Sequence, residues 1–136
     1  MHHKNKTLAT LLAVILGGFG AHRFYLYGRR NIGAWLHFVS FPLSLFAVTA
    51  LPGQPVLFAG CLFVISVLAG MIGALVIGLT PDARWDATYN SSSGKPSDSG
   101  WPVILLVILA MASGMTGLIA AIARTFDLLF TGGAYG

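Results

Sequence analysis

Four apolar runs separated by short polar segments set the pattern of this chain. Three of them, at residues 32–51, 56–79 and 102–123, contain no charged residue. Each reaches the roughly 20 helical residues that cross a hydrocarbon core about 30 Å thick. The first run, residues 7–19, reaches that length only by continuing through the polar residues that follow it. We therefore predict an all-α integral membrane protein with four transmembrane helices, at about residues 7–21, 32–51, 56–79 and 102–123.

The polar segments divide the chain into two parts. Residues 1–52 are predicted to form a helical hairpin, and residues 53–136 a second helix pair. Thr80-Pro81 is a favourable helix start, which predicts a short surface helix at residues 81–89. Trp85 and Tyr89 share one face of that helix and suit an interfacial anchor. A flexible linker rich in Ser and Gly then extends to residue 100.

Composition supports the membrane class. Hydrophobic residues make up 56% of the chain and charged residues 9%, whereas a soluble domain carries about 25% charged residues. The net charge of +4 comes from basic residues that flank the apolar runs, which points to topology and lipid headgroups. We expect membrane lipids as partners, and no nucleic acid. The single cysteine, Cys61, lies in an apolar run and cannot form an internal disulfide.

Loop charges give an orientation for the four-helix arrangement. One side would carry five basic residues and the other only Lys4, Lys6 and Arg124, which favours both termini outside. The orientation inverts if Lys4 and Lys6 dominate because the first helix inserts first. A further alternative treats the first run as a cleaved signal peptide, with Gly18 and Gly20 before the cut.

Small residues recur at a spacing of four in three of the runs. This spacing keeps them on one helix stripe, where they allow the close packing that holds membrane helices together. The pattern leaves open whether they pack within one chain or between chains. The predicted packing residues are Ala13, Gly17, Gly70, Ala74, Gly78, Gly117 and Ala121.

The most distinctive segment reads Gly17-Gly18-Phe19-Gly20-Ala21-His22-Arg23-Phe24-Tyr25-Leu26. With the lysines before it, it resembles the TM-2 domain family over about residues 4–51. These are small membrane proteins of bacteria and animals, and the bacterial ones are sometimes called NINE proteins. The resemblance implies a helical hairpin whose turn lies at one membrane face, with no established enzymatic activity. Gly28 comes one residue late for the family pattern, and the second helix lacks the closing Trp and Asp.

This segment is the candidate contact site for an anionic lipid or a partner protein. The glycines let the chain leave the helix, Arg23 suits a phosphate group, and the aromatic rings suit the membrane interface. The alternative is an anchored turn whose arginine extends to the headgroups. His37, inside the second run, is an intramembrane polar candidate or a helix contact. The candidate turn residues are Gly17, Gly18, Gly20, His22, Arg23, Phe24 and Tyr25.

Catalysis has no support in the residue pattern. It offers no nucleophile–base set, no paired carboxylates in a span and no Cys/His metal spacing, so we expect no enzyme, cofactor or metal site. The segment Met1-His2-His3 could bind copper or nickel through a free terminus, unless it is a tag remnant or a disordered end.

We therefore favour a non-enzymatic scaffold or accessory subunit of the bacterial inner membrane that packs with itself or a membrane partner. The alternative is a small oligomeric channel or transporter. The glycine string is one residue short, at two places, of the Gly-Gly-x-x-Gly-Ala-x-x-Arg signature of fluoride channels, and their Thr-Thr-Phe-Ser signature is absent.

Overall fold

The computed structural model describes residues 3–135, so Met1 and His2 of the candidate copper or nickel site lie outside the described residues. Within residues 3–135 the chain is helical and contains no strand, which confirms the all-α prediction. Asn5 and Asn31 cap α1 and α3 by accepting hydrogen bonds from the backbone N–H groups of Leu8 and Ala34. The elements in chain order are α1 (Lys6–Leu16), the 3-10 turn η1 (Gly17–Phe19), α2 (Ala21–Tyr27), α3 (Ile32–Ala50), α4 (Val56–Ala59), α5 (Cys61–Leu79), α6 (Asp82–Tyr89) and α7 (Trp101–Thr131).

Three helices are long and apolar enough to cross a membrane, namely α3, α5 and α7, so the prediction of four spans is wrong. The first run forms only the 11-residue α1, which is about 16 Å long, or half the hydrocarbon core. It ends because residues 17–19 form a 3-10 turn and Gly20 takes a left-handed conformation with a φ of 73°. The hydropathy pattern indicates the length of this apolar run, but it does not indicate where the chain reverses its direction.

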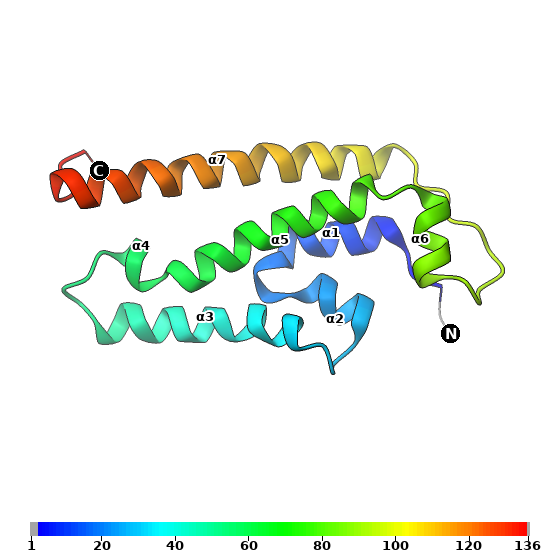
Figure 1. Cartoon of the computed structure of the whole chain (residues 1–136), viewed down its shortest axis with the longest axis horizontal. Coiled ribbons are helices and arrows are strands. Elements are labelled where there is room, and N and C mark those ends of the chain that lie inside the picture. The colour runs from blue at the N-terminus through cyan, green and yellow to red at the C-terminus, as the bar shows by residue number, and fades with distance from the viewer. Residues whose placement is uncertain (1–2, 136) are drawn as a thin grey trace.

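The α1, η1 and α2 segments form a re-entrant hairpin, which enters the bundle and leaves it at the same end (Figure 1). At the open end, Lys6 Nζ of α1 donates to the carbonyl of Thr80, just beyond α5, at 2.7 Å. At the tip, Gly17 packs against Gly70, the midpoint of α5. The chain then returns through α2, and Lys4 Nζ donates to the carbonyl of Tyr25 at 3.1 Å. The hairpin therefore reaches about half of the span depth.

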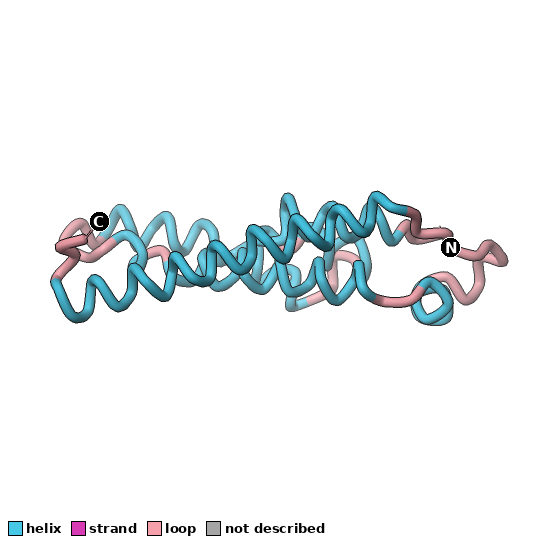
Figure 2. The backbone as a smooth tube through the Cα atoms, turned by 90° about the horizontal axis from the view of Figure 1, so that it is seen from above, coloured by secondary structure: helices cyan, strands magenta, loops and turns pink. Residues whose placement is uncertain are grey.

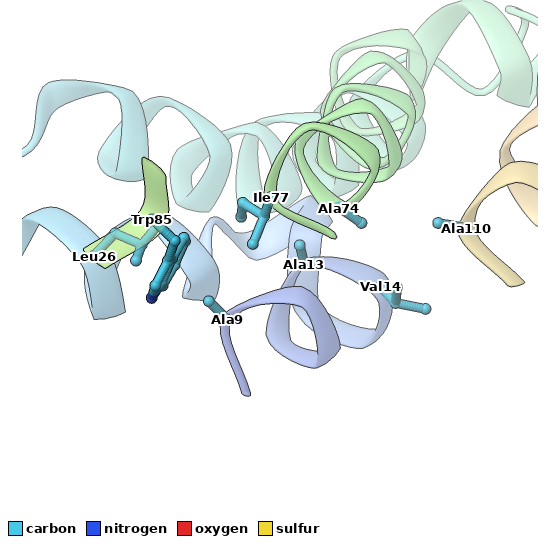
Figure 3. Packing of buried hydrophobic residues seen from close by; sticks show 8 residues of the cluster. All are labelled: Ala9, Ala13, Val14, Leu26, Ala74, Ile77, Trp85 and Ala110. Atoms are coloured by element: carbon cyan, nitrogen blue, oxygen red, sulfur yellow. The ribbon is translucent and has the colours of Figure 1, made fainter. Parts of the chain in front are cut away.

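Helix α5 is the centre of the bundle and packs against α1, η1, α3 and α7 (Figures 1 and 2). The α1–α5 interface consists of small residues, with Ala13 and Ala74 fully buried (Figure 3). A Cβ atom added to Gly17 would lie 2.8 Å from the Cα of Gly70, so the two backbones are in direct contact. The interface thus joins the two predicted halves of the chain.

The other predicted packing residues, Gly78, Gly117 and Ala121, lie at the contact between α5 and α7. A Cβ atom on Gly78 would lie 2.3 Å from Cγ2 of Val107, a residue of α7. Gly117 is exposed, and its added Cβ would lie 3.7 Å from Cδ2 of Leu68, while Ala121 is half-buried. Contact between α5 and α7 is therefore tight near Gly78 and looser near Gly117.

Helix α6 closes the open end of the hairpin. Lys6 is buried and pairs with Asp82 at 2.6 Å. Burial raises the pKa of Asp82, but hydrogen bonds from Lys6 and Ser99 outweigh burial and lower it to about 2. The Trp85 side chain is 1% exposed, packs beside Ala9 and Leu26, and donates to the carbonyl of Lys4 at 3.1 Å (Figure 3). Trp85 is therefore a core residue, and its predicted role as an interfacial anchor is wrong.

The re-entrant hairpin changes the topology. The two termini lie at opposite ends of the bundle, not on the same side as the four-helix arrangement required (Figure 1). Lys4 and Lys6 now share one end with the loop at residues 28–31 and with α6 and its linker. Of the eight basic residues, only Arg124 belongs to the C-terminal part of α7, which leads to the other end. By the positive-inside rule this bias favours a cytoplasmic N-terminal end.

We predict this orientation to be visible in cysteine labelling. In a Cys61→Ala background, single cysteines replace His3, Ser93 or Ala134, and intact cells are treated with an impermeant maleimide. The cysteine at 134 should label, whereas those at 3 and 93 should label only after permeabilisation. Labelling of 3 together with 134, and not 93, would restore the four-span topology and contradict the re-entrant hairpin.

The glycine contact makes a second prediction. Gly70→Ala should lower the free energy of unfolding in detergent by about 1–3 kcal/mol, because its Cβ would lie 2.6 Å from the carbonyl carbon of Gly17. Gly117→Ala is the matched control on α7, and it should be neutral or stabilising by up to about 1 kcal/mol because its Cβ finds ordinary contact distances. Equal effects of the two substitutions would contradict a backbone-to-backbone contact.

Candidate functional site

The predicted contact turn lies half-way along α5, not at the membrane face that the family resemblance implied. This buried position requires glycines, because a side chain there would collide with α3 or α5. A Cβ atom on Gly18 would lie 2.7 Å from Cγ2 of Val67, and one on Gly20 would lie 2.7 Å from the carbonyl oxygen of Ala34. The tip therefore fits between α3 and α5 only because these positions have no side chain.

A hydrogen-bonded chain satisfies the exposed backbone of the tip. Ser66 Oγ of α5 donates to the carbonyl of Gly18 at 2.7 Å. Since the hydroxyl has one proton, Nδ1 of His37 must carry the proton of the 2.7 Å hydrogen bond between His37 and Ser66. Non-helical backbone at membrane depth needs such partners, because lipid offers none. His37 and Ser66 thus join α3, α5 and the tip.

His22 and Arg23 follow the tip on α2. The His22 ring meets His37 edge-on, with centroids 5.8 Å apart. His22 is 3% exposed, and its Nδ1 has no hydrogen-bond partner among the described residues. Nε of Arg23 is also buried, and it has no hydrogen-bond partner among residues 3–135. The turn therefore holds two polar groups at membrane depth with unused hydrogen-bonding capacity.

The two aromatic residues of the predicted turn make internal contacts. Phe24 packs edge-on against Trp35 of α3, with centroids 5.3 Å apart. The Tyr25 hydroxyl accepts a hydrogen bond from the backbone N–H of Asn5 at 2.8 Å. These contacts fix the return segment of the hairpin to α3 and to the N-terminal residues.

An aromatic cluster lies beyond the tip, toward the C-terminal end of the bundle. The rings of Phe19, Phe41 and Phe63 have pairwise centroid distances of 5.1 to 5.3 Å. They come from η1, α3 and α5, and they meet where the hairpin reverses. On this side the polar groups of the tip are therefore followed by a cluster of three apolar rings.

Comparison with known families bears on the first three helices. Residues 2–51 match the family model of the TM2 domain. The predicted resemblance is confirmed. No curated protein and no solved structure gives a significant match to this chain. The matched residues contain the hairpin and α3, whereas α5, which supplies Gly70 and Ser66, lies outside the match.

The structure brings together Gly18, His22 and His37, all within the matched residues, and adds residues that the sequence analysis did not assign to the site. Ser66 was not among the predicted packing or site residues, yet it bonds both Gly18 and His37. Gly73 and Gly33 leave the space in which His22 and Arg23 lie, since their Cβ atoms would be 3.0 and 2.7 Å from those side chains. Gly73 does not belong to the series of small residues spaced four apart. This extra glycine in the span was the signal that could have indicated a second contact.

We predict that Ser66→Ala weakens the tip. The carbonyl of Gly18 and Nδ1 of His37 both lose their partner, which should cost about 1–3 kcal/mol of unfolding free energy. Thermal unfolding in detergent and hydrogen exchange at residues 17–20 measure the effect. Ser113→Ala is the control, because that exposed hydroxyl bonds only Leu109 of its own turn and Met71. A Ser66 variant as stable and as protected as the Ser113 variant would contradict the role of the hydrogen-bonded chain.

Proposed function

We propose that this chain is a non-enzymatic, multi-pass protein of the bacterial inner membrane that serves as a scaffold or accessory subunit. It packs with itself or with a membrane partner through the outer face of α7. The bacterial location rests on the NINE-type resemblance. The observation that supports the proposal is that α7 leaves a face with exposed small residues uncovered.

Helix α7 contacts the bundle along one face only. It packs on α5 and α1, with a smaller contact to α4, and Val103 and Ala110 are its buried residues (Figure 1). The opposite face carries Ala112, Thr116 and Ala120, all exposed and four residues apart. This stripe leaves a shallow surface on which a second helix can approach closely.

Close approach matters because lipid provides no hydrophobic drive between helices. Association then depends on van der Waals packing through small residues and on hydrogen bonds from residues such as threonine. In this chain the stripe on α1 and α5 is already used inside the bundle. The stripe on α7 is available for a partner.

A channel is the second candidate, because re-entrant helices and intramembrane polar residues occur in channels and transporters. The cluster of Phe19, Phe41 and Phe63 favours the accessory role, since it places apolar rings next to the polar tip on the side of the far end. Ion flux into liposomes above that of empty vesicles would favour the channel instead.

We predict that the double variant Ala112→Ile with Ala120→Ile weakens association by about tenfold, the equivalent of ~1.4 kcal/mol. Cross-linking in native membranes and a mild-detergent pull-down read by mass spectrometry give the measurement. Ala50→Ile, an equally exposed alanine at the end of α3, is the control and should retain the partner or the second copy. Association that survives in the double variant would refute the use of this face.

A further inference from the structure

Two adjoining hollows lie between α5 and the α2–α3 side of the bundle, on a surface that α7 does not contribute to. One, of about 320 Å³, is lined by residues that include His22, Arg23 and Gly73. The other, of about 490 Å³, is lined by residues that include Arg23, His37 and Ser66. Arg23 and Ala69 border both hollows, so together they form one groove along α5, which we call the Arg23 groove. A water molecule occupies about 30 Å³ in the liquid, so the groove has room for a much larger ligand than water.

Arg23 has no acidic partner among the described residues. The ion pairs in that part of the chain are Lys6 with Asp82 and Arg124 with Asp127. A guanidinium within a membrane is costly unless a counter-charge or the headgroup region receives it. The unpaired Nε of Arg23 and the 97% buried His22 ring beside it both border the groove. The positive charge of the groove is therefore left for a ligand to neutralise.

The fold keeps this charge in place at the first turn of α3. Nη1 of Arg23 lies against Gly33, the second residue of α3, where a Cβ atom would be 2.7 Å away. Arg29 and Arg30 precede α3 at the same end of the bundle. The guanidinium thus extends from α2 to the first turn of α3 and faces the leaflet of the N-terminal end, and anionic phospholipids gather on the cytoplasmic side of a membrane.

Away from Arg23 the groove becomes apolar. Leu36 of α3 and Leu62 and Ile65 of α5 line its remaining length and are exposed. Along α5, the distance from Ala69, which borders both hollows with Arg23, to Leu62 at the apolar end corresponds to about 10 Å of helix. A cationic head followed by an apolar track matches one phospholipid, with its phosphate at Arg23 and one acyl chain between α3 and α5.

We propose that the Arg23 groove binds an anionic phospholipid of the N-terminal leaflet, with Arg23 as the phosphate ligand. Guanidinium binds phosphate through two parallel hydrogen bonds, which an ammonium group does not reproduce. A zwitterionic lipid fits less well because its ammonium group would lie beside the same arginine. This site is independent of the association through α7, since the two surfaces share no residue.

Native mass spectrometry of the delipidated full-length chain tests the proposal. Phosphatidylglycerol should bind about tenfold more tightly than phosphatidylcholine, and Arg23→Gln should abolish that preference. The double variant Arg29→Gln with Arg30→Gln is the matched control and should keep most of it. Loss of the preference in the control to the same extent, or its survival in Arg23→Gln, would overturn the site.

Two further measurements separate the remaining outcomes. On the wild-type chain, phosphatidylglycerol with a diazirine on its acyl chain should label the peptide of Leu36, which lines the groove but not the apolar hollow near Phe126. This measurement keeps the test valid if Arg23→Gln does not fold. Labelling confined to the apolar hollow near Phe126 would contradict the groove. Inorganic phosphate in excess should leave the lipid adducts unchanged, and displacement of the lipid by phosphate would show a free-anion site instead.

Discussion

The contact between the backbones of Gly17 and Gly70 is the constraint on which the rest of the structure depends. The two glycines let α1 lie directly on α5, and any side chain at either position would separate the helices. This contact fixes the depth at which the chain reverses. It also brings the carbonyl of Gly18 to Ser66, so the break in the helix occurs where a hydrogen-bond donor is present.

The polar residues of α2 owe their position to this reversal. In a continuous first span, His22 and Arg23 would lie near the end of a helix and could extend to water. In the re-entrant hairpin they face α3 and α5, in spaces left by Gly33 and Gly73. Their buried atoms without partners follow from that geometry, and so does the open groove that they border.

The same reversal explains the charges at the N-terminal end. Because α1 returns through α2, Lys4 and Lys6 meet α6 and the carbonyls of α2. Lys6 is buried there with Asp82, and Trp85 covers the open end of the hairpin. The weak charge bias of a four-span chain becomes a strong one in a three-span chain, which is why the orientation depends on the depth of one hairpin.

The sequence by itself determined most of the helices and the membrane class, because hydropathy and helix capping act within a segment. The predicted spans at 32–51 and 102–123 and the surface helix at 81–89 agree with Ile32–Ala50, Trp101–Thr131 and Asp82–Tyr89 to within a few residues, except that α7 runs on to Thr131. The family also followed from a local string of residues. Only the tertiary structure decided that the first apolar run turns back, because this depends on contacts with α5, about 50 residues further along the chain. It also decided which side chains the glycines accommodate, since a glycine in the sequence does not reveal what occupies the space beside it.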